Sequence, residues 1–312
     1  MINLTIFTPT YNRKQILQWC YAKLCDQTNK EFIWLIVDDG STDNTNNEVE
    51  KWQKEDKIKI EYIKQQNGGK YKAVNTAVKN CKTELFAFCD SDDYYLPTTV
   101  EKLLNIWDKI KSDNKISGIV ARRGTQDGVA IGKKLNIANQ KINFDTLVKK
   151  YKFYGDTCRM YRTDILKKVL YPELDEKFIP ENVMLSQIDQ NYDIYFINEP
   201  FSISEYLEDG YTKNYMKLLN KNPNGYLLSL NYELVTKKGF LYKLKTVISY
   251  TTFSWRRRIK VYKKCLNKPL YLIGLPFSMI AYILGVPKWH ERKKNSIVEK
   301  IKNRIKIYYY FL

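Results

Sequence analysis

The chain has 312 residues, of which 44% are hydrophobic and 28% are charged. These values are ordinary for a soluble globular protein, and the length rules out a chain too small to bury a core of its own. The net charge of +18 is unusual and has one source: residues 1–209 hold 30 Lys and Arg against 31 Asp and Glu, whereas residues 210–312 hold 22 against 3. A segment of one charge sign indicates an anionic partner, either membrane lipid or nucleic acid.

The first 120 residues alternate short apolar runs with segments of helical periodicity. Strands are predicted at Ile2–Thr8, Phe32–Val37, Ile58–Ile63, Leu85–Cys89 and Ile116–Ala121, and helices at Arg13–Cys25, Asn44–Lys54, Lys70–Asn80 and Thr98–Lys111. This alternation predicts βαβ units and a mostly parallel sheet flanked by helices. Ligands of such sheets bind beyond the carboxyl ends of the strands. Three polar clusters lie at those ends: Thr8–Arg13, Asp38–Asp43 and Asp90–Asp93.

The later residues follow a different pattern. Residues 122–210 are less regular, with loops predicted around Gly124–Gly132 and a strand at Ile194–Ile197. From about Tyr211 the sequence becomes basic, rich in tyrosine and helical in its apolar spacing. We therefore predict three parts: one half of an α/β domain at about 1–120, its second half at about 121–210, and a basic helical region at 211–312.

The six cysteines show neither a CxxC pair nor a metal-ligand spacing. Several lie in apolar or amphipathic runs, where small buried thiols are typical. The opening residues MINLTIFTPTYN lack the basic and long apolar regions of a signal peptide and predict a strand instead. We expect a reducing, cytoplasmic compartment for the main domain.

The run Asp90-Ser91-Asp92-Asp93 is the sharpest chemical feature of the sequence. Three carboxylates directly after a buried strand repel one another and raise one another's pKa unless a positive charge lies among them. A hard divalent cation, with phosphate oxygens completing its shell, would supply that charge. The alternative is an acidic turn that caps the helix opening near Pro97.

Two further clusters are weaker when each is taken alone. Asp38–Asp43 ends a strand, and capping of the next helix explains Ser41 or Asp43 but leaves Asp38 and Asp39 without a role. A carboxylate there could accept from a uracil imide or a ribose hydroxyl. Asn67–Asn75 places paired glycines and lysines at a helix start, an arrangement that suits a pyrophosphate.

Together these clusters resemble the family-2 glycosyltransferases, which have the Rossmann-like GT-A fold. The matching segments are Thr8–Arg13, Asp38–Asp43, Gly68-Gly69-Lys70 with Asn75, and Asp90–Asp93. Their order and spacing agree over about the first 110 residues. The resemblance implies inverting transfer of a hexosyl or N-acetylhexosaminyl group from a nucleoside-diphosphate donor, commonly a UDP-sugar, with Mn²⁺ or Mg²⁺.

The resemblance also implies roles for individual residues. Contacts to the nucleotide fall to Thr8, Pro9, Tyr11, Arg13, Asp39, Lys72, Asn75 and Asp90. Asp39 is the predicted reader of uracil, Asp92 with Asp90 the predicted metal ligands, and Asp93 the predicted contact to the donor sugar. Many GT-A enzymes complete the metal shell with a histidine. His290 is the chain's one histidine and lies deep in the basic tail, so we expect the acidic cluster, the diphosphate and water to hold the metal.

Inverting transfer needs a carboxylate that takes the proton of the attacking acceptor hydroxyl. Glu181 follows a segment that resembles the family's approach to the acceptor side, and it is the predicted base. Asp156 is the alternative, and plain helix-start electrostatics is a competing explanation for Glu181. The segment Glu205–Gly210 resembles one found in bacterial capsule and wall-polysaccharide members, so the expected acceptor is a cell-surface polysaccharide or a lipid-linked glycan.

The basic tail favours a membrane over nucleic acid, because its apolar content is too high for a nucleic-acid arm. Amphipathic segments around Leu244 and Ile301 flank the uncharged stretch Pro269–Pro287. Such helices suit an anionic membrane surface, and the uncharged stretch is at the short end for a span. We predict an interfacial or re-entrant segment, with a packed helical hairpin as the alternative, and peripheral attachment to the cytoplasmic face of the cell membrane.

Two other functions fit parts of the sequence. A sugar-phosphate nucleotidyltransferase shares an α/β nucleotide fold and a metal, but it would carry a glycine-rich loop after the first strand, and Thr8–Arg13 contains no glycine. A non-catalytic membrane-bound carbohydrate- or nucleotide-binding protein of the same fold is the other alternative. The intact acidic run Asp90–Asp93 argues against that alternative.

Overall fold

The computed structural model describes residues 2–204 and 211–285 of the chain. The chain divides into two compact units, Met1–Glu173 with Asn191–Gly210 and Leu174–Gln190 with Tyr211–Leu312. Three features named from the sequence lie outside the described residues: the Glu205–Gly210 segment, His290 and the amphipathic segment around Ile301.

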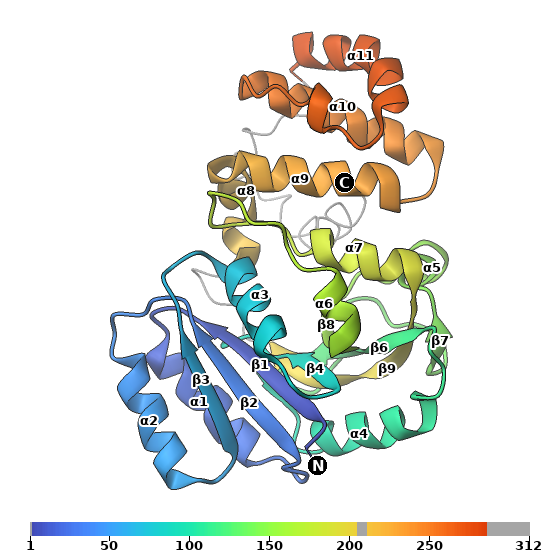
Figure 1. Cartoon of the computed structure of the whole chain (residues 1–312). Coiled ribbons are helices and arrows are strands. Elements are labelled where there is room, and N and C mark those ends of the chain that lie inside the picture. Colours follow the sequence, from blue (N-terminus) through green and yellow to red (C-terminus); the bar gives the residue numbers. More distant parts are fainter. Residues whose placement is uncertain (1, 205–210, 286–312) are drawn as a thin grey trace. The chain divides into compact units, whose positions relative to one another are not determined.

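A sheet forms the centre of the first unit (Figure 1). Among the described residues it has nine strands, in the order β3-β2-β1-β4-β8-β6-β9-β5, with β7 paired to β9. The strands are β1 (Leu4–Thr10), β2 (Phe32–Asp38), β3 (Lys59–Lys64), β4 (Leu85–Phe88), β5 (Asp93–Tyr95), β6 (Ile116–Gly124), β7 (Gln140–Ile142), β8 (Thr157–Arg162) and β9 (Asp193–Ser204). β1 pairs in parallel with β2 and β4, and β2 with β3, as the alternating pattern predicts. The other half is mixed, because β8 runs antiparallel to β4 and β6.

Helices cover both faces of this sheet (Figure 1). They are α1 (Lys14–Cys25), α2 (Thr45–Glu55), α3 (Lys70–Asn80), α4 (Thr99–Ile110), α5 (Phe144–Tyr151) and α6 (Thr163–Lys168). On one face Leu17, Trp52 and Leu103 of α1, α2 and α4 share a buried core with Ile6 and Trp34 of the strands. α3 contacts β1, β2 and α6 from the other face. The α/β class predicted from the sequence is confirmed.

The second unit is helical in its described part. It contains α7 (Asn182–Asn191, all but the last residue), α8 (Tyr211–Lys221), α9 (Pro223–Thr236), α10 (Phe240–Arg256), a short 3₁₀ turn η1 (Tyr262–Lys264) and α11 (Lys268–Ile283). Leu230 and Leu234 of α9 form a buried core with Val247, Tyr250 and Phe253 of α10. The helical character predicted after Tyr211 is therefore present up to residue 283.

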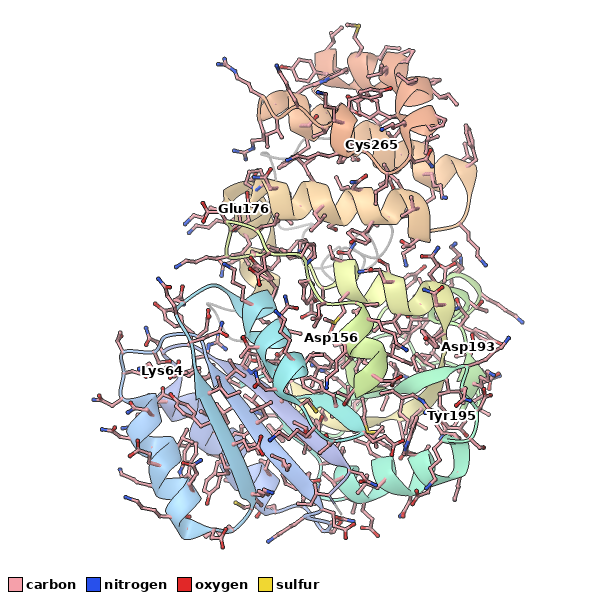
Figure 2. All side chains as sticks on the ribbon, viewed as in Figure 1. Lys64, Asp156, Glu176, Asp193, Tyr195 and Cys265 are labelled. Carbon is pink, nitrogen blue, oxygen red and sulfur yellow. The ribbon has the colours of Figure 1, made fainter. Side chains whose placement is uncertain are left out.

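Glu176, labelled in Figure 2, fixes the start of α9. Its carboxylate accepts hydrogen bonds from the backbone N–H groups of Asn224 at 2.9 Å and Gly225 at 2.7 Å. These N–H groups have no partner within the helix, so the acid satisfies them and complements the helix dipole. A Cβ at position 225 would lie 2.2 Å from the carbonyl oxygen of Phe178, which explains the glycine.

The segment around Leu244 differs from its prediction as a membrane-facing amphipathic helix. Val247 and Tyr250 of α10 are buried, and Leu244 packs against the same core, so the apolar stripe faces the protein from Leu244 onward. Phe240 and Leu241 at the start of the helix are exposed. The uncharged stretch at Pro269–Pro287 instead forms most of α11. No described helix combines the length and the apolar character that crossing a membrane requires.

Glu233 is a buried acid inside the second unit, and it predicts a pH-dependent stability. Its carboxylate accepts from the Asn182 amide at 2.7 Å and from the Tyr242 hydroxyl at 3.0 Å. Burial raises the pKa of Glu233 from its ordinary 4.5 to about 7, although Tyr242, Lys237 and Asn182 act in the opposite direction. Between these two values the folded protein holds a proton that the unfolded chain releases, so the free energy of unfolding falls as the pH rises.

Replacing Glu233 with glutamine should remove this dependence, because the amide resembles the protonated acid. Urea unfolding at pH 4.5 and pH 7.5 should show wild-type stability falling by up to about 3 kcal/mol relative to Glu233→Gln. The same pH slope in both proteins would show that Glu233 is not the titrating group.

Candidate functional site

The loops after β1 and β2 are joined by hydrogen bonds at the carboxyl edge of the sheet. The Asn12 side chain accepts from the backbone of Thr42 at 2.8 Å, and the Ser41 hydroxyl accepts from the backbone of Asn12 at 2.8 Å. Asp43 accepts from the backbone of Lys14 at 3.0 Å, at the start of α1. The clusters Thr8–Arg13 and Asp38–Asp43 therefore meet, as parallel strands predict.

Asp39 ties the second loop to the glycine turn before α3. One carboxylate oxygen accepts from the Gln65 amide at 2.7 Å and from the backbone of Gly68 at 2.9 Å. The other accepts from the Asn67 amide at 3.2 Å and from the backbone of Gly69 at 2.7 Å. The carboxylate is thus already bonded to four donors. A contact with uracil requires Gln65 or Asn67 to move aside, and the predicted reading of the base stays a prediction.

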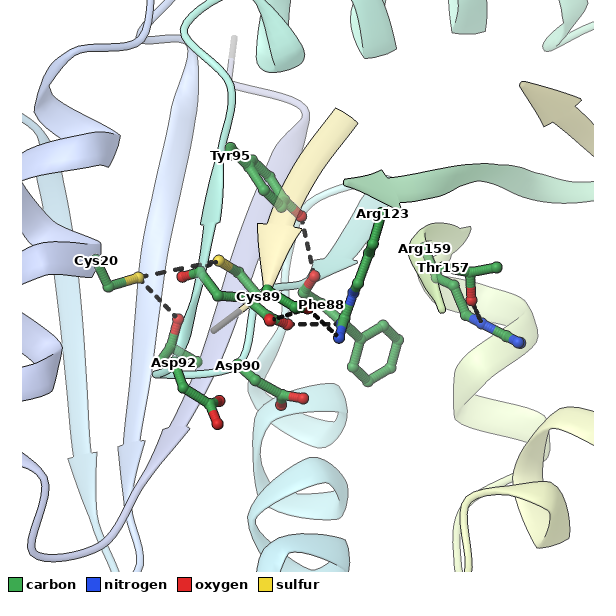
Figure 3. Close-up of polar contacts among 12 residues, drawn as sticks. Cys20, Phe88, Cys89, Asp90, Asp92, Tyr95, Arg123, Thr157 and Arg159 are labelled. Atoms are coloured by element: carbon green, nitrogen blue, oxygen red, sulfur yellow. Dashed lines mark hydrogen bonds and ion pairs between the residues drawn. The ribbon is translucent and has the colours of Figure 1, made fainter. Parts of the chain in front are cut away.

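The acidic run forms the turn between β4 and β5, and each of its carboxylates has a basic partner. Figure 3 shows Asp90 and Asp92 of this turn together with Arg123. Nζ of Lys70 lies 2.8 Å from one oxygen of Asp90 and 2.9 Å from the other. Arg13 lies 3.3 Å from Asp92. The third acid of the run, Asp93, begins β5 and has its own partner on β6.

That partner is Arg123, whose guanidinium lies 2.7 Å from Asp93. Ser204 of β9 completes the group, since its hydroxyl donates to the other oxygen of Asp93 at 2.5 Å and accepts from Arg123 at 3.2 Å. The protein itself therefore places three cations beside the acids. The divalent metal predicted at this turn stays a prediction.

These contacts set the protonation of the site. Burial opposes ionisation of Asp90, but the charges of Lys70, Arg123 and Arg13 outweigh it and hold the pKa of the carboxyl below its ordinary value. Burial raises the pKa of Asp93 above its usual range, and the neighbouring acids add to this effect, while Arg123 and Ser204 oppose it. Asp90 is therefore an anion at neutral pH, and Asp93 is the weaker acid of the two.

The carboxylates can be compared with the needs of a divalent metal. The side chains of Asp90 and Asp92 are 27% and 23% exposed, whereas that of Asp93 is 5% exposed and bonded to Arg123. Within the described residues no group of three His, Cys, Asp or Glu side chains is placed to hold a metal. Mg²⁺ commonly binds one or two carboxylates and completes its shell with substrate phosphates and water. Asp90 and Asp92 fit such a shared site.

The other predicted nucleotide residues differ in how accessible they are. Tyr11 is 48% exposed and Pro9 is partly buried, so both offer surface beside the site. The hydroxyl of Thr8 is fully buried and accepts from the Trp34 indole at 2.9 Å, so any contact of Thr8 with a ligand falls to its backbone. The methylenes of Lys72 pack beside Gly68, where a Cβ would lie 2.5 Å from the lysine Cδ.

Asn75 is 5% exposed and is bonded to a neighbouring loop. Its amide donates to the carbonyl of Tyr171 at 2.8 Å, and its oxygen accepts from the backbone N–H of Tyr171 at 2.9 Å. Both polar atoms therefore fasten α3 to residue 171. The nucleotide contact predicted for Asn75 stays a prediction, and it would replace these bonds.

The two candidates for the base belong to different units. Asp156, labelled in Figure 2, lies beside the acidic turn, because its carbonyl accepts from the backbone of Arg123 at 3.0 Å and its charge acts on the guanidinium. Glu181 belongs to the second unit. It directly precedes α7, and its carbonyl accepts from Met184 and Leu185 at 3.1 Å.

Lys70 and Arg123 were not among the site residues predicted from the sequence, although both touch the acidic turn. Lys70 lies in the glycine-lysine segment, but the predicted nucleotide contact in that segment is Lys72. Arg123 follows the apolar run Ile116–Ala121, and two arginines at the end of a buried strand were the available signal.

Known proteins with similar sequences point to the same family that the site residues resemble. Residues 5–170 match the family model described as glycosyl transferase family 2. Poly(ribitol-phosphate) beta-N-acetylglucosaminyltransferase TarS of Staphylococcus aureus is 29% identical over 181 residues, which cover 55% of this chain and 30% of that protein. The putative teichuronic acid biosynthesis glycosyltransferase TuaG of Bacillus subtilis is 26% identical over 147 residues, which cover 47% of this chain and 57% of TuaG. The chain thus spans only part of these relatives.

Solved structures share the fold. The crystal structure of S. aureus TarS 1–349 in complex with UDP-GlcNAc has a TM-score of 0.62 at 18% identity, covering 90% of this chain and 81% of that chain. The mannosyltransferase PcManGT from Pyrobaculum calidifontis, in complex with GDP-Man and Mn²⁺, has a TM-score of 0.52 at 13% identity, covering 99% of this chain and 85% of that one. The GT-A fold expected from the sequence is confirmed.

Proposed function

The chain belongs to glycosyl transferase family 2, and from this premise we propose that it transfers a sugar with inversion from a UDP-sugar to a glycan acceptor. The observation that carries the proposal is the junction of three loops at the carboxyl edge of the sheet. There the Asp39-bound glycine turn and the Asp90–Asp93 turn are joined through Lys70. This edge is where open α/β sheets bind nucleotides.

The residues at this edge of the sheet have different roles in donor binding and sugar transfer. Tyr11 offers an exposed ring to the base, and Asp39 reads the imide. Lys70 and Arg13 pair with Asp90 and Asp92 of the acidic turn, and they can neutralise a diphosphate as it leaves. Asp92 and Asp90 would hold a divalent cation, which supplies further charge neutralisation at the diphosphate. A carboxylate, Glu181 or Asp156, takes the proton of the attacking acceptor hydroxyl.

For the acceptor we propose a bacterial cell-surface polysaccharide or lipid-linked glycan. The support comes from two relatives, the poly(ribitol-phosphate) beta-N-acetylglucosaminyltransferase TarS and the putative teichuronic acid biosynthesis glycosyltransferase TuaG. A lipid-linked acceptor places the protein at the cytoplasmic face of the membrane. The sugar would be a hexose or an N-acetylhexosamine, in line with the named activity of TarS.

A panel of nucleotide sugars tests this proposal, with release of the nucleotide measured in the presence and absence of Mn²⁺. UDP-sugars should be turned over, and UDP should bind more tightly than CDP. Asp39→Asn should weaken UDP binding by at least about tenfold and reduce its preference over CDP, because only an anion accepts strongly from the uracil imide.

Asn67→Ala is the matched control for this variant. It removes one donor from the Asp39 carboxylate and loosens the same turn, but it keeps the anion. It should lower the affinity for both nucleotides and leave their ratio unchanged. Equal UDP and CDP affinities in the wild-type protein would rule out the assignment to Asp39, and no turnover of any nucleotide sugar would rule out the proposed function.

A further inference from the structure

Helix α11 touches the rest of its unit through a narrow stripe. Leu270, Tyr271, Gly274 and Ser278 are its buried residues. A Cβ at position 274 would lie 2.4 Å from Cγ1 of Val247, so glycine permits the close approach of α11 to α10. The buried Ser278 hydroxyl donates to the carbonyl of Gly274 within the same helix, at 2.8 Å, so it needs no hydrogen-bond partner from α10.

The rest of α11 is apolar and exposed. Its exposed side chains, together called the α11 surface, are Leu272, Ile273, Phe277, Met279, Ile280, Tyr282, Ile283 and the following Leu284, at 44–75% exposure. No charged residue occurs between Lys268 and Lys288. A helix at a protein–water boundary normally carries polar residues on its outer face, and one that is apolar all round is normally covered on all sides.

The chain around this surface carries one sign of charge. Residues 234–285 contain eleven Lys and Arg and no Asp or Glu. Arg258, Lys260, Lys263, Lys264 and Lys268 are exposed. The guanidinium of Arg256 lies 6.0 Å from the ring of Tyr282, so basic groups reach the edge of the α11 surface.

We propose that the α11 surface docks on an anionic lipid bilayer. Its Leu, Ile, Phe and Met side chains would enter the boundary between headgroups and acyl chains, and the surrounding lysines and arginines would lie against anionic headgroups. Each basic residue near such a surface and each buried aliphatic side chain favours binding. The docking itself does not depend on the proposed function. Its role, which is to hold the enzyme where a lipid-linked acceptor lies, does rest on that function.

Other occupants fit less well. A nucleic acid would meet the charges, but six of the eight residues of the α11 surface are Leu, Ile or Met and offer bases no ring on which to stack. In a second copy of the chain, placed symmetrically, the two basic rims would face each other and repel. Residues 286–312 carry eight Lys and Arg against two Glu, so that segment too would bring positive charge to a positive rim.

Vesicle sedimentation of the full chain tests the proposal. The wild-type protein should bind vesicles of phosphatidylcholine and phosphatidylglycerol, bind pure phosphatidylcholine weakly, and release as the salt concentration rises. Ile283→Glu should weaken binding to the anionic vesicles by at least about tenfold, because Ile283 is the most exposed large hydrophobic residue of α11, at 75%. Lys263→Gln with Lys264→Gln should weaken binding at low salt and have little effect at high salt.

Val129→Glu is the matched control. It adds the same charge at an exposed aliphatic position, 63% accessible, in the other unit, so it should bind vesicles as the wild type does. Equal binding by all variants, or no binding to anionic vesicles by a folded wild type, would overturn the proposal.

Three further outcomes would point to another occupant and would also overturn the proposal: a wild-type dimer that Ile283→Glu dissociates without lipid, tight binding of single-stranded RNA at physiological salt, or vesicle binding only after removal of residues 286–312. Turnover of UDP-sugars is measured separately without vesicles. If the protein binds vesicles through Ile283 but turns over no donor, the proposed function is contradicted and the proposed membrane docking of the α11 surface is still supported.

Discussion

Replacing Asp92 with alanine is expected to reduce sugar transfer by about 100-fold or more while the protein remains folded. Asp92 lies in the turn between β4 and β5, and its side chain is 23% exposed and outside the buried core. Its ion pair with Arg13, at 3.3 Å, is partly exposed and contributes little to stability. A large loss of activity would then come from the chemistry at the diphosphate, where we place the divalent metal.

The ion pair offers a matched control for this prediction. Arg13→Ala breaks the same contact but keeps the carboxylate, so it should raise the KM for the donor and leave the Mn²⁺ concentration at half-maximal rate nearly unchanged. Asp92→Ala should raise that concentration strongly. EDTA should abolish transfer by the wild-type protein. Full activity in EDTA, or the same Mn²⁺ dependence in both variants, would remove the metal role of Asp92.

The first 110 residues could be predicted closely, because their signals are local. α3 begins and ends at Lys70 and Asn80, as predicted, and β2 extends its predicted range by one residue to Asp38. Apolar runs and helical periods depend on neighbouring residues alone. The carboxyl-edge junction followed from the parallel order of β1, β2 and β4. The six cysteines, all within the described residues, are free thiols and five are buried, as their apolar neighbours indicated.

The partners of the acidic residues could not be predicted, because they come from distant parts of the chain. β5 has three residues and opens with Asp93, and it is a strand only because it pairs with β9 about a hundred residues later. The same pairing brings Ser204 to Asp93, and the β6–β9 pairing brings Arg123. Three acids within four residues therefore indicated repulsion, whereas the folded chain places a basic side chain beside each of them.

The tail shows a second limit of sequence patterns. Helical spacing reveals that a segment has an apolar face, but it does not show what covers that face. Around Leu244 the covering is the protein itself, through Val247 and Tyr250. In α11 the stripe formed by Gly274 and Ser278 is covered, and the wider face is exposed. Small residues on an otherwise bulky apolar helix were the signal that its protein contact would be narrow.

Replacing Glu181 with glutamine is expected to slow transfer by about 10² to 10⁴-fold and leave the affinity for UDP unchanged. Glutamine keeps the size of the side chain and removes its ability to accept a proton. Glu181 directly precedes α7, where the helix dipole favours the anion that a general base requires. The rate loss should appear in kcat, and the acidic limb of the pH–rate profile should disappear with it.

Asp156→Asn decides between the two candidates, because each variant removes one proton acceptor. Asp156 belongs to the unit that holds the acidic turn, and its charge acts on Arg123. If it only supports Arg123, its loss should disturb donor binding and leave the acidic limb of the pH–rate profile in place. If Asp156→Asn instead removes that limb while Glu181→Gln transfers sugar at nearly the wild-type rate, Asp156 is the base. Glu181 would then serve only the start of α7, and its replacement should alter the stability of the second unit more than the chemical step.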